Sequence, residues 1–406
     1  MLSTSLASRL PVSGSLGTGR FRAVVRNLAS AAAVVSIATG CARATSGTTT
    51  GLPTAGAPAR AADTVWYIST RAREDGRDTR RFADSLEYGF AVHSYSSRAD
   101  VLTGALEMAL VDSVQLTQAA FIMGLRQAAG EDPASEDFAL LYVHGYGTGL
   151  HECWQHASES RIRSRASVPW VAFCWPSRGS GLAPPSRGAI LDNGYVEDSV
   201  AAFASRPAFV QAAGTVLDAL TAARVLLVGH SMGAALLGAA VSDSTPLRVR
   251  LLVDPARAIA FVAADIAADH FVDSIVPAAA PLAARVVAYI SGRDRMLTLS
   301  CQRSGLARAG QRQQVPLVAP ELEIVDATDA LVAESGFQRV FGTHHALRRA
   351  SAVLFDLMRV IGAGRSAGCR ATLGTAAISG DGIWTMSAAR PDTAATRQCN
   401  ASYPGR

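Results

Sequence analysis

The residues best suited to chemistry lie in the stretch 224–241, which reads RVLLVGHSMGAALLGAAV. Its GHSMG motif separates a short apolar run from a small, helix-favouring one. A G-x-S-x-G sequence between a strand and a helix predicts a sharp turn that presents the serine hydroxyl, because small residues let the backbone pass closely. The helix behind the serine would aim free N–H groups at any negative charge forming there. We therefore predict that Ser231 is a nucleophile.

Short apolar runs mark the strands that would position this serine and other polar residues. The runs are 65–68, 90–93, 140–143, 170–173, 225–228, 249–253 and 285–290. Helical patterns at 111–129, from 196, at 209–222 and at 345–361 alternate with the later runs. This alternation predicts an α/β domain, a mainly parallel sheet with helices on both faces.

Five candidate residues come just after predicted strands, and the carboxyl ends of parallel strands share one edge of a sheet. They are His144, Trp175, Ser231, Asp254 and Asp294.

The order of motifs resembles a known family. HGY (144–146), WPSRG (175–179), GHSMG, the segment leading to Asp294 and a late histidine are similar to a bacterial α/β-hydrolase family known mainly as a domain of unknown function. Tyr195 and Asp198 also stand where that family carries a Tyr and an Asp. The resemblance covers about 65–361 and implies the α/β-hydrolase fold and a serine nucleophile, but little about substrate.

Two acids are candidates for the carboxylate that orients the base. In α/β-hydrolases the order is serine, acid, histidine. Asp294 follows the predicted strand 285–290, where such folds usually place the acid, and we favour it. Asp254 follows the predicted strand 249–253 and is the alternative; otherwise it is a turn residue that accepts backbone N–H bonds.

The base must accept the serine proton. Of the eight histidines, only His344 and His345 follow both acids. The step from His344 to the 351–354 segment matches the family, so we choose His344 and keep His345 as the alternative. His230 is expected to pack rather than react, and His144 to be a structural neighbour of the site.

The oxyanion of an acyl intermediate needs two N–H donors. We expect the N–H of Met232, directly after the nucleophile, and one from the loop after residue 143, for which Tyr146 is the candidate. The flanking Gly145 and Gly147 would let this backbone approach.

Metal and cofactor chemistry find no support in the motifs. His151 and His156 are five residues apart, whereas a helical H-E-x-x-H zinc site needs four. The chain has no lysine, so it has no Walker A loop, Schiff-base lysine or Ser-Lys dyad. We expect no cofactor and no metal.

The N-terminus predicts export. Basic residues precede a short apolar run, 28–38, and an Ala-Thr-Gly-Cys sequence that resembles a lipobox ending at Cys41. An ordinary signal peptide is the alternative. We divide the chain into a signal segment 1–41, a flexible linker 42–63, a hydrolase domain 64–362 and a tail 363–406. In the tail we expect Cys369 to pair with Cys399, while Cys153 and Cys174 are expected to be apolar filler.

Charge and motifs together define the expected function. Loss of the four arginines of segment 1–41 lowers the net charge from +5 to +1, and a nucleic-acid partner loses its main support. We expect an exported, lipid-anchored serine hydrolase of the cell envelope that cleaves a small-molecule or lipid-like ester or related acyl bond. A hydrolase-like binding or scaffold protein without turnover is the alternative.

Overall fold

A computed structural model describes residues 61–74, 77–99, 106–130, 137–177, 193–314, 317–330 and 344–387. All of them fall in one compact unit, Ala57–Arg406. Cys41, Cys399 and the segments 1–41 and 42–60 lie outside the described residues, so the predictions made for them stay predictions.

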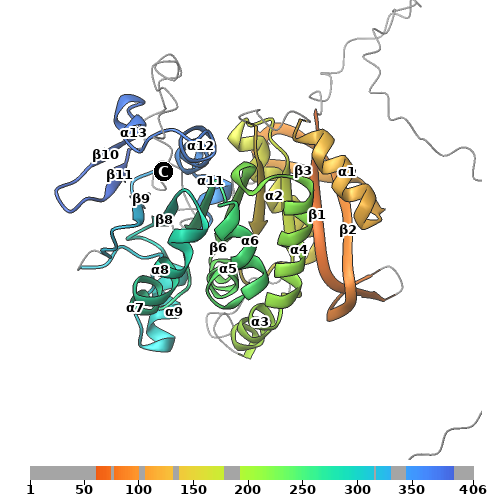
Figure 1. The fold of residues 1–406 in the computed structure, drawn as a ribbon, viewed down its shortest axis with the longest axis horizontal. Coiled ribbons are helices and arrows are strands. Elements are labelled where there is room, and N and C mark those ends of the chain that lie inside the picture. Colours follow the sequence, from red (N-terminus) through yellow and green to blue (C-terminus); the bar gives the residue numbers. More distant parts are fainter. Residues whose placement is uncertain are drawn as a thin grey trace, which may run out of the picture. The chain divides into compact units, whose positions relative to one another are not determined.

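The described strands form one eleven-stranded sheet in the order β10-β11-β9-β8-β7-β6-β4-β5-β1-β2-β3 (Figure 1). The run from β11 to β1 is parallel, whereas β10, β2 and β3 pair in antiparallel fashion at the two ends. The strands are β1 Ala61–Glu74, β2 Arg77–Ala99, β3 Leu106–Leu116, β4 Ala139–Val143, β5 Trp170–Cys174, β6 Val225–His230, β7 Ala258–Val262, β8 Val286–Ile290, β9 Leu322–Asp326, β10 Ala376–Ile378 and β11 Trp384–Met386.

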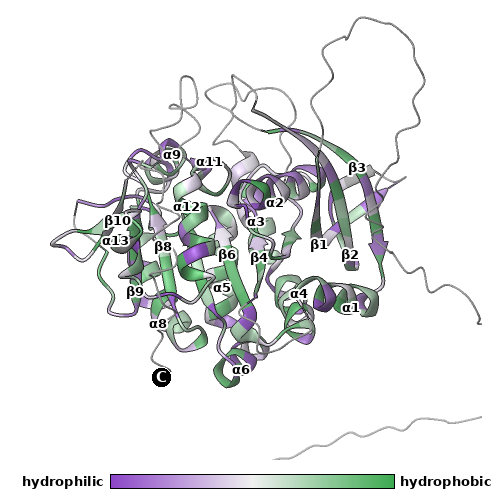
Figure 2. Ribbon diagram, turned by 90° about the horizontal axis from the view of Figure 1, so that it is seen from above, coloured by the Kyte–Doolittle hydropathy of each residue, from purple (hydrophilic) through white to green (hydrophobic). Residues whose placement is uncertain are grey.

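Helices cover both faces of this sheet (Figure 2). On one face α5 packs with α3, α4, α6 and α8, and α4 also contacts α1. On the other face α2 packs on β5 and β1 and contacts α11 and α12. The helices are α1 Gln118–Ala128, α2 Leu150–Ser164, α3 Asn193–Ala204, α4 Arg206–Ala219, α5 Met232–Asp243, α6 Thr245–Val253, α7 Ala268–His270, α8 Val276–Ala279, α9 Arg295–Ser304, α11 Ala346–Arg349, α12 Ser351–Asp356 and α13 Cys369–Thr372.

Shorter helical turns join these elements: η2 Ala222–Arg224, η3 Phe271–Ile275, η4 Ala280–Leu282 and η6 Leu357–Ile361.

Each central strand contributes side chains to two apolar cores, because successive side chains point to opposite faces of the sheet. In β6, Leu227 faces the core under α4 and α5, while Leu226 and Val228 face the core under α2 and α12. Burial on both faces explains why the central strands are continuous apolar runs rather than alternating ones.

The N-terminal strands are longer than the sequence predicted. β1 begins at Ala61, inside the predicted linker 42–63, and runs to Glu74, while β2 begins at Arg77. Both strands therefore reach into the polar stretch 71–82, where Arg71 pairs with Phe82. The predicted helix 111–129 was wrong in its first third: residues up to Leu116 belong to β3, paired with β2. The helix begins after Thr117, whose side chain accepts a hydrogen bond from the Ala120 N–H and caps it.

The predicted strand 249–253 was also wrong. These residues end helix α6, which carries Pro246 in its first turn and buries Leu247 and Leu251, one helical turn apart. The strand that follows α5, which we call the elbow helix because it begins directly after the sharp turn predicted at Ser231, is instead β7, which begins at Ala258. It lies within the Ala-rich stretch 255–284, so the strand was predicted too early in the chain.

The C-terminal residues extend the sheet instead of forming a separate tail. The sequence predicted a domain that ends at residue 362, but β11 pairs with β9 and β10 pairs with β11. A buried ion network also joins this segment to the domain. The guanidinium of Arg370 donates to both carboxylate oxygens of Asp356, at 2.8 and 3.0 Å, and to Glu323 at 2.8 Å. Tyr289 of β8 donates to the same Asp356.

The cysteines differ from prediction at one pair. Cys153 of α2 and Cys174 at the end of β5 form a disulfide, rather than serving as apolar filler, because α2 packs directly on β5. Cys369 is also disulfide-bonded, and its expected partner Cys399 lies outside the described residues. Cys301 is the free cysteine among the residues that the structure describes.

Within the described part of the chain, no helix is both long and apolar enough to cross a membrane.

Candidate active site

Ser231 stands at a sharp turn between β6 and α5. Its backbone has a positive φ of 55° with ψ −122°, a conformation that costs a non-glycine residue energy. A Cβ at Gly229 would lie 2.6 Å from Ala234 Cα, and one at Gly233 would lie 2.4 Å from the Val143 carbonyl oxygen. Both glycines are therefore required sterically, one by the helix that follows and the other by the neighbouring strand.

Ser231, His344 and Asp294 form a continuous line of hydrogen bonds. The Ser231 Oγ lies 2.8 Å from His344 Nε2, and His344 Nδ1 lies 2.8 Å from Asp294 Oδ2. Because an ionised carboxylate only accepts, Nδ1 carries the proton and Nε2 is left to accept from the serine hydroxyl. All three side chains are buried, with 3% of Ser231, 8% of His344 and none of Asp294 exposed.

The carboxylate of Asp294 makes His344 a stronger base. Burial by itself would lower the pKa of His344, but the charge and hydrogen bond of Asp294, together with the charge of Asp265, raise the pKa above its usual range. Burial would likewise raise the pKa of Asp294, but His344 and the Leu297 N–H hold that pKa below its ordinary value. The site can therefore accept a proton on His344 and stabilise the resulting imidazolium.

Two further contacts hold Asp294 and His344 in place. Asp294 follows β8 and caps α9, since its Oδ1 accepts from the Leu297 N–H at 3.0 Å while Oδ2 faces His344. His230 Nε2 donates to the backbone carbonyl oxygen of His344 at 2.7 Å. The sequence predicted packing for His230, and its position before the serine gave no signal of this contact with the residue at 344.

His345 is the N-cap residue of α11 and lies beside this line of hydrogen bonds. Its ring centroid is 5.8 Å from that of His344 and 6.0 Å from that of His230. The bonds to Ser231 and Asp294 belong to His344.

The loop after β4 lies against the serine. A Cβ at Gly145 would be 2.9 Å from Ser231 Cβ, so the backbone that leads into Tyr146 lies next to Ser231. Met232, the first residue of α5, follows the serine directly.

His144 packs at the start of this loop. It is fully buried, stacks on Trp175 and donates from Nδ1 to the Gly145 carbonyl at 2.8 Å. Burial lowers the pKa of His144 to about 3, so this ring stays neutral.

A second carboxylate near the serine was missed by the sequence analysis. The Asp265 N–H donates to the Ser231 carbonyl at 3.2 Å, and its carboxylate accepts from Tyr195 Oη at 2.5 Å and Ser300 Oγ at 2.6 Å. Burial, followed by the charge of Asp265, raises the pKa of Tyr195 to about 12. Recognition of β7 as the strand after the elbow helix would have pointed to Asp265.

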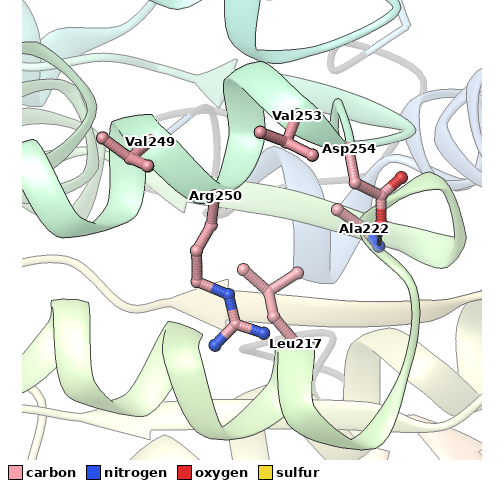
Figure 3. A pocket seen from close by; sticks show the side chains of 6 residues that line it. All are labelled: Leu217, Ala222, Val249, Arg250, Val253 and Asp254. Carbon is pink, nitrogen blue, oxygen red and sulfur yellow. Dashed lines mark hydrogen bonds between the residues drawn. The ribbon is translucent and has the colours of Figure 1, made fainter.

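Asp254 lies at the amino edge of the sheet, opposite to the carboxyl edge where Ser231 lies. Its carboxylate accepts from the Ala222 N–H at 2.6 Å, and Ala222 precedes β6 whereas Ser231 follows it. Asp254 therefore cannot orient His344, and the alternative acid is wrong because the strand predicted before it is a helix. Asp254 helps to line a pocket of about 350 Å³ on this edge (Figure 3), together with Leu217, Ala222, Val249, Arg250 and Val253.

Within the described ranges, no three His, Cys, Asp or Glu side chains are grouped so that they could hold a metal ion. His151 and His156 both lie on α2.

The family described as "Alpha/beta hydrolase of unknown function (DUF900)" matches residues 131–327. This match and the mainly parallel sheet with helices on both faces show that the chain has the α/β-hydrolase fold. They support hydrolase chemistry in general. Among curated proteins, none matches the chain significantly.

Three of the solved structures that are similar to the chain are described as a hydrolase, an esterase/lipase and an esterase. A predicted CIB-like hydrolase from Thermoplasma acidophilum is 14% identical, with 73% of this chain and 100% of that chain covered and a TM-score of 0.28. An esterase/lipase from an uncultured bacterium is 12% identical, with 75% and 88% covered and a TM-score of 0.27. An esterase from Pyrobaculum calidifontis is 9% identical, with 67% and 82% covered and a TM-score of 0.27.

Proposed function

We propose that the protein is a serine hydrolase that cleaves an ester or related acyl bond through Ser231, His344 and Asp294. The observation that carries this proposal is the unbroken line of hydrogen bonds from the serine hydroxyl to the buried carboxylate. Its members come from three separate places in the chain, after β6, after β8 and before α11.

The first half of the reaction forms an acyl-enzyme. Ser231 Oγ attacks the carbonyl carbon of the substrate while its proton moves to His344 Nε2. Asp294 stabilises the imidazolium that results. The tetrahedral intermediate then expels the alcohol, which takes the proton from Nε2. In the second half, His344 accepts a proton from water, the hydroxide attacks the acyl carbon, and Ser231 leaves with the proton restored.

The oxyanion of each intermediate would be bound by the N–H groups of Met232 and Tyr146. Two features support this choice. Met232 opens a helix of 12 residues, whose N-terminus favours negative charge. Tyr146 follows Gly145, whose backbone lies against Ser231.

Hydrolysis of a panel of p-nitrophenyl esters tests this function. We expect Ser231→Ala and His344→Ala to lower kcat by several orders of magnitude, because the members of such a group act as a unit. His345→Ala is the matched control for the base and Asp254→Asn the control for the acid, and both should keep most activity. Equal losses in His344→Ala and His345→Ala would contradict the assignment. A folded wild type that turns over no ester would favour the non-catalytic binding or scaffold alternative.

The substrate class and location remain proposals from the sequence. We propose a small-molecule or lipid-like ester, and export followed by lipid anchoring at Cys41. Cys41→Ala should then move the protein from the membrane fraction to the soluble fraction. A mature N-terminus at another residue, identified by mass spectrometry, would contradict the anchor.

A further inference from the structure

Asp198 ties together two loops at the carboxyl edge of the sheet. It lies on α3, with 3% of its surface exposed. Its Oδ2 accepts from the Gly147 N–H at 3.1 Å and from Ser177 Oγ at 2.5 Å. Gly147 belongs to the loop after β4 and Ser177 to the loop after β5, so one carboxylate oxygen fixes the distance between them.

Ser177 passes this restraint on to the next residue of the β4 loop. Its Oγ accepts from the Thr148 N–H at 3.1 Å while it donates to Asp198. The guanidinium of Arg71, which is itself buried, donates to the carbonyl oxygens of Thr148, Trp175 and Ser177 at 3.0 to 3.1 Å.

Tyr146 lies between the two fixed ends of this loop. On one side Gly145 rests against Ser231, and on the other side the Gly147 N–H is held by Asp198. The position of the Tyr146 N–H therefore depends on contacts that lie outside the catalytic residues. Oxyanion donors act only when they are held in advance at the place where the negative charge develops.

We propose that Asp198 is a positioning residue for the reaction, which holds the Tyr146 N–H where the oxyanion forms. The inference rests on the proposed function. Asp198 touches neither substrate nor the reacting atoms; it acts through Gly147 and Ser177.

The carboxylate offers a graded test, because the Gly147 and Ser177 donors use the same oxygen. Asp198→Asn keeps the shape of the side chain and one carbonyl oxygen as acceptor, whereas Asp198→Leu keeps the approximate volume and removes every acceptor. We expect kcat for a p-nitrophenyl ester to fall about 10- to 100-fold in Asp198→Leu and only a few-fold in Asp198→Asn, with KM changed little.

Asp63→Asn is the matched control. Asp63 is also buried, accepts from Ser158 Oγ at 2.6 Å and pairs with Arg161, but it lies near the start of β1, at the amino edge of the sheet. This variant should lose stability in thermal unfolding and keep its kcat. Ser177→Ala provides a second variant, and its effect on kcat should not add to that of Asp198→Leu, because the two residues share one network.

A thionoester separates positioning from general loss of structure. Sulfur is a weaker hydrogen-bond acceptor than oxygen, so the rate ratio of an oxoester to its thionoester reports the oxyanion donors. That ratio should fall in Asp198→Leu and Ser177→Ala and stay at the wild-type value in Asp63→Asn. The pH dependence of kcat/KM should not shift, because the His344–Asp294 pair is untouched.

Wild-type kcat and an unchanged ester ratio in folded Asp198→Leu and Ser177→Ala would overturn the inference while leaving the proposed function intact. An inactive wild type that does not react at Ser231 would instead overturn the proposed function.

Discussion

His344 Nδ1 lies 2.8 Å from Asp294 Oδ2, although the two residues are 50 positions apart in the chain. The carboxylate is buried, and its other oxygen caps α9. A single side chain therefore joins the start of a helix to His344, so changes at Asp294 should be visible both in the pH dependence of activity and in stability.

The acid limb of the profile of kcat/KM against pH should lie above pH 6.5. In the proposed reaction His344 must be neutral to accept the serine proton. Because its pKa is raised from the ordinary value of 6.5, we expect activity to be lost on acidification at a higher pH than for an ordinary histidine. In Asp294→Asn the attraction is gone and burial lowers the pKa, so the limb of the residual activity should move to lower pH. A profile of kcat/KM against pH measures this, and a limb that does not move would contradict the coupling.

His344 and Asp294 contribute to the stability of the fold with opposite dependence on pH. The raised pKa of His344 contributes stability that is present below the unfolded-state pKa and is lost as pH rises through the folded-state pKa. The lowered pKa of Asp294 contributes stability that is present above its unfolded-state pKa and is lost as pH falls through the folded-state pKa.

His230→Phe should lower kcat about tenfold with little change in KM. The phenyl ring keeps the packing beside His344 but removes the Nε2–H that donates to the His344 carbonyl. A misplacement of the base on the order of 1 Å is enough for a loss of this size or more. Steady-state kinetics at saturating ester measures it, and wild-type kcat would show that the bond does not position the base.

Removal of the Cys153–Cys174 disulfide should lower the free energy of unfolding by about 3 kcal/mol, since the bond closes a loop with a sequence separation of 21. The variant to compare in denaturant unfolding is Cys153→Ala/Cys174→Ala. Cys301→Ala is the control, because that thiol is free. Equal unfolding midpoints for wild type and the double variant would contradict a structural role.

The sequence predicted the central features of the site because they depend on local pattern and chain order. The motifs and their order predicted the two glycines of GHSMG, the strand before Ser231 and the positions of Asp294 and His344. The strand after the elbow helix could not, because Val249–Val253 has the apolar character of a strand, and only its packing against the domain shows that it ends a helix with Pro246 in its first turn.

Contacts between distant segments could not be predicted from the sequence either. The disulfide needs α2 to pack on β5, and the Asp198 contacts need α3 to meet the loops after β4 and β5. The family resemblance pointed to the position of Asp198, but neither spacing nor residue type predicts which groups its carboxylate contacts. The hydrogen bonds of His230 and Asp265 likewise depend on the assembled carboxyl edge of the sheet.

The most direct test of the central claim is the site of covalent labelling by a fluorophosphonate. The folded wild type, treated with the probe and digested, should carry the adduct on Ser231 in the peptide map, and His344→Ala should label far more slowly. Labelling should be repeated with detergent or lipid present. Absence of an adduct on Ser231 under all of these conditions, or equal labelling of wild type and His344→Ala, would contradict the account.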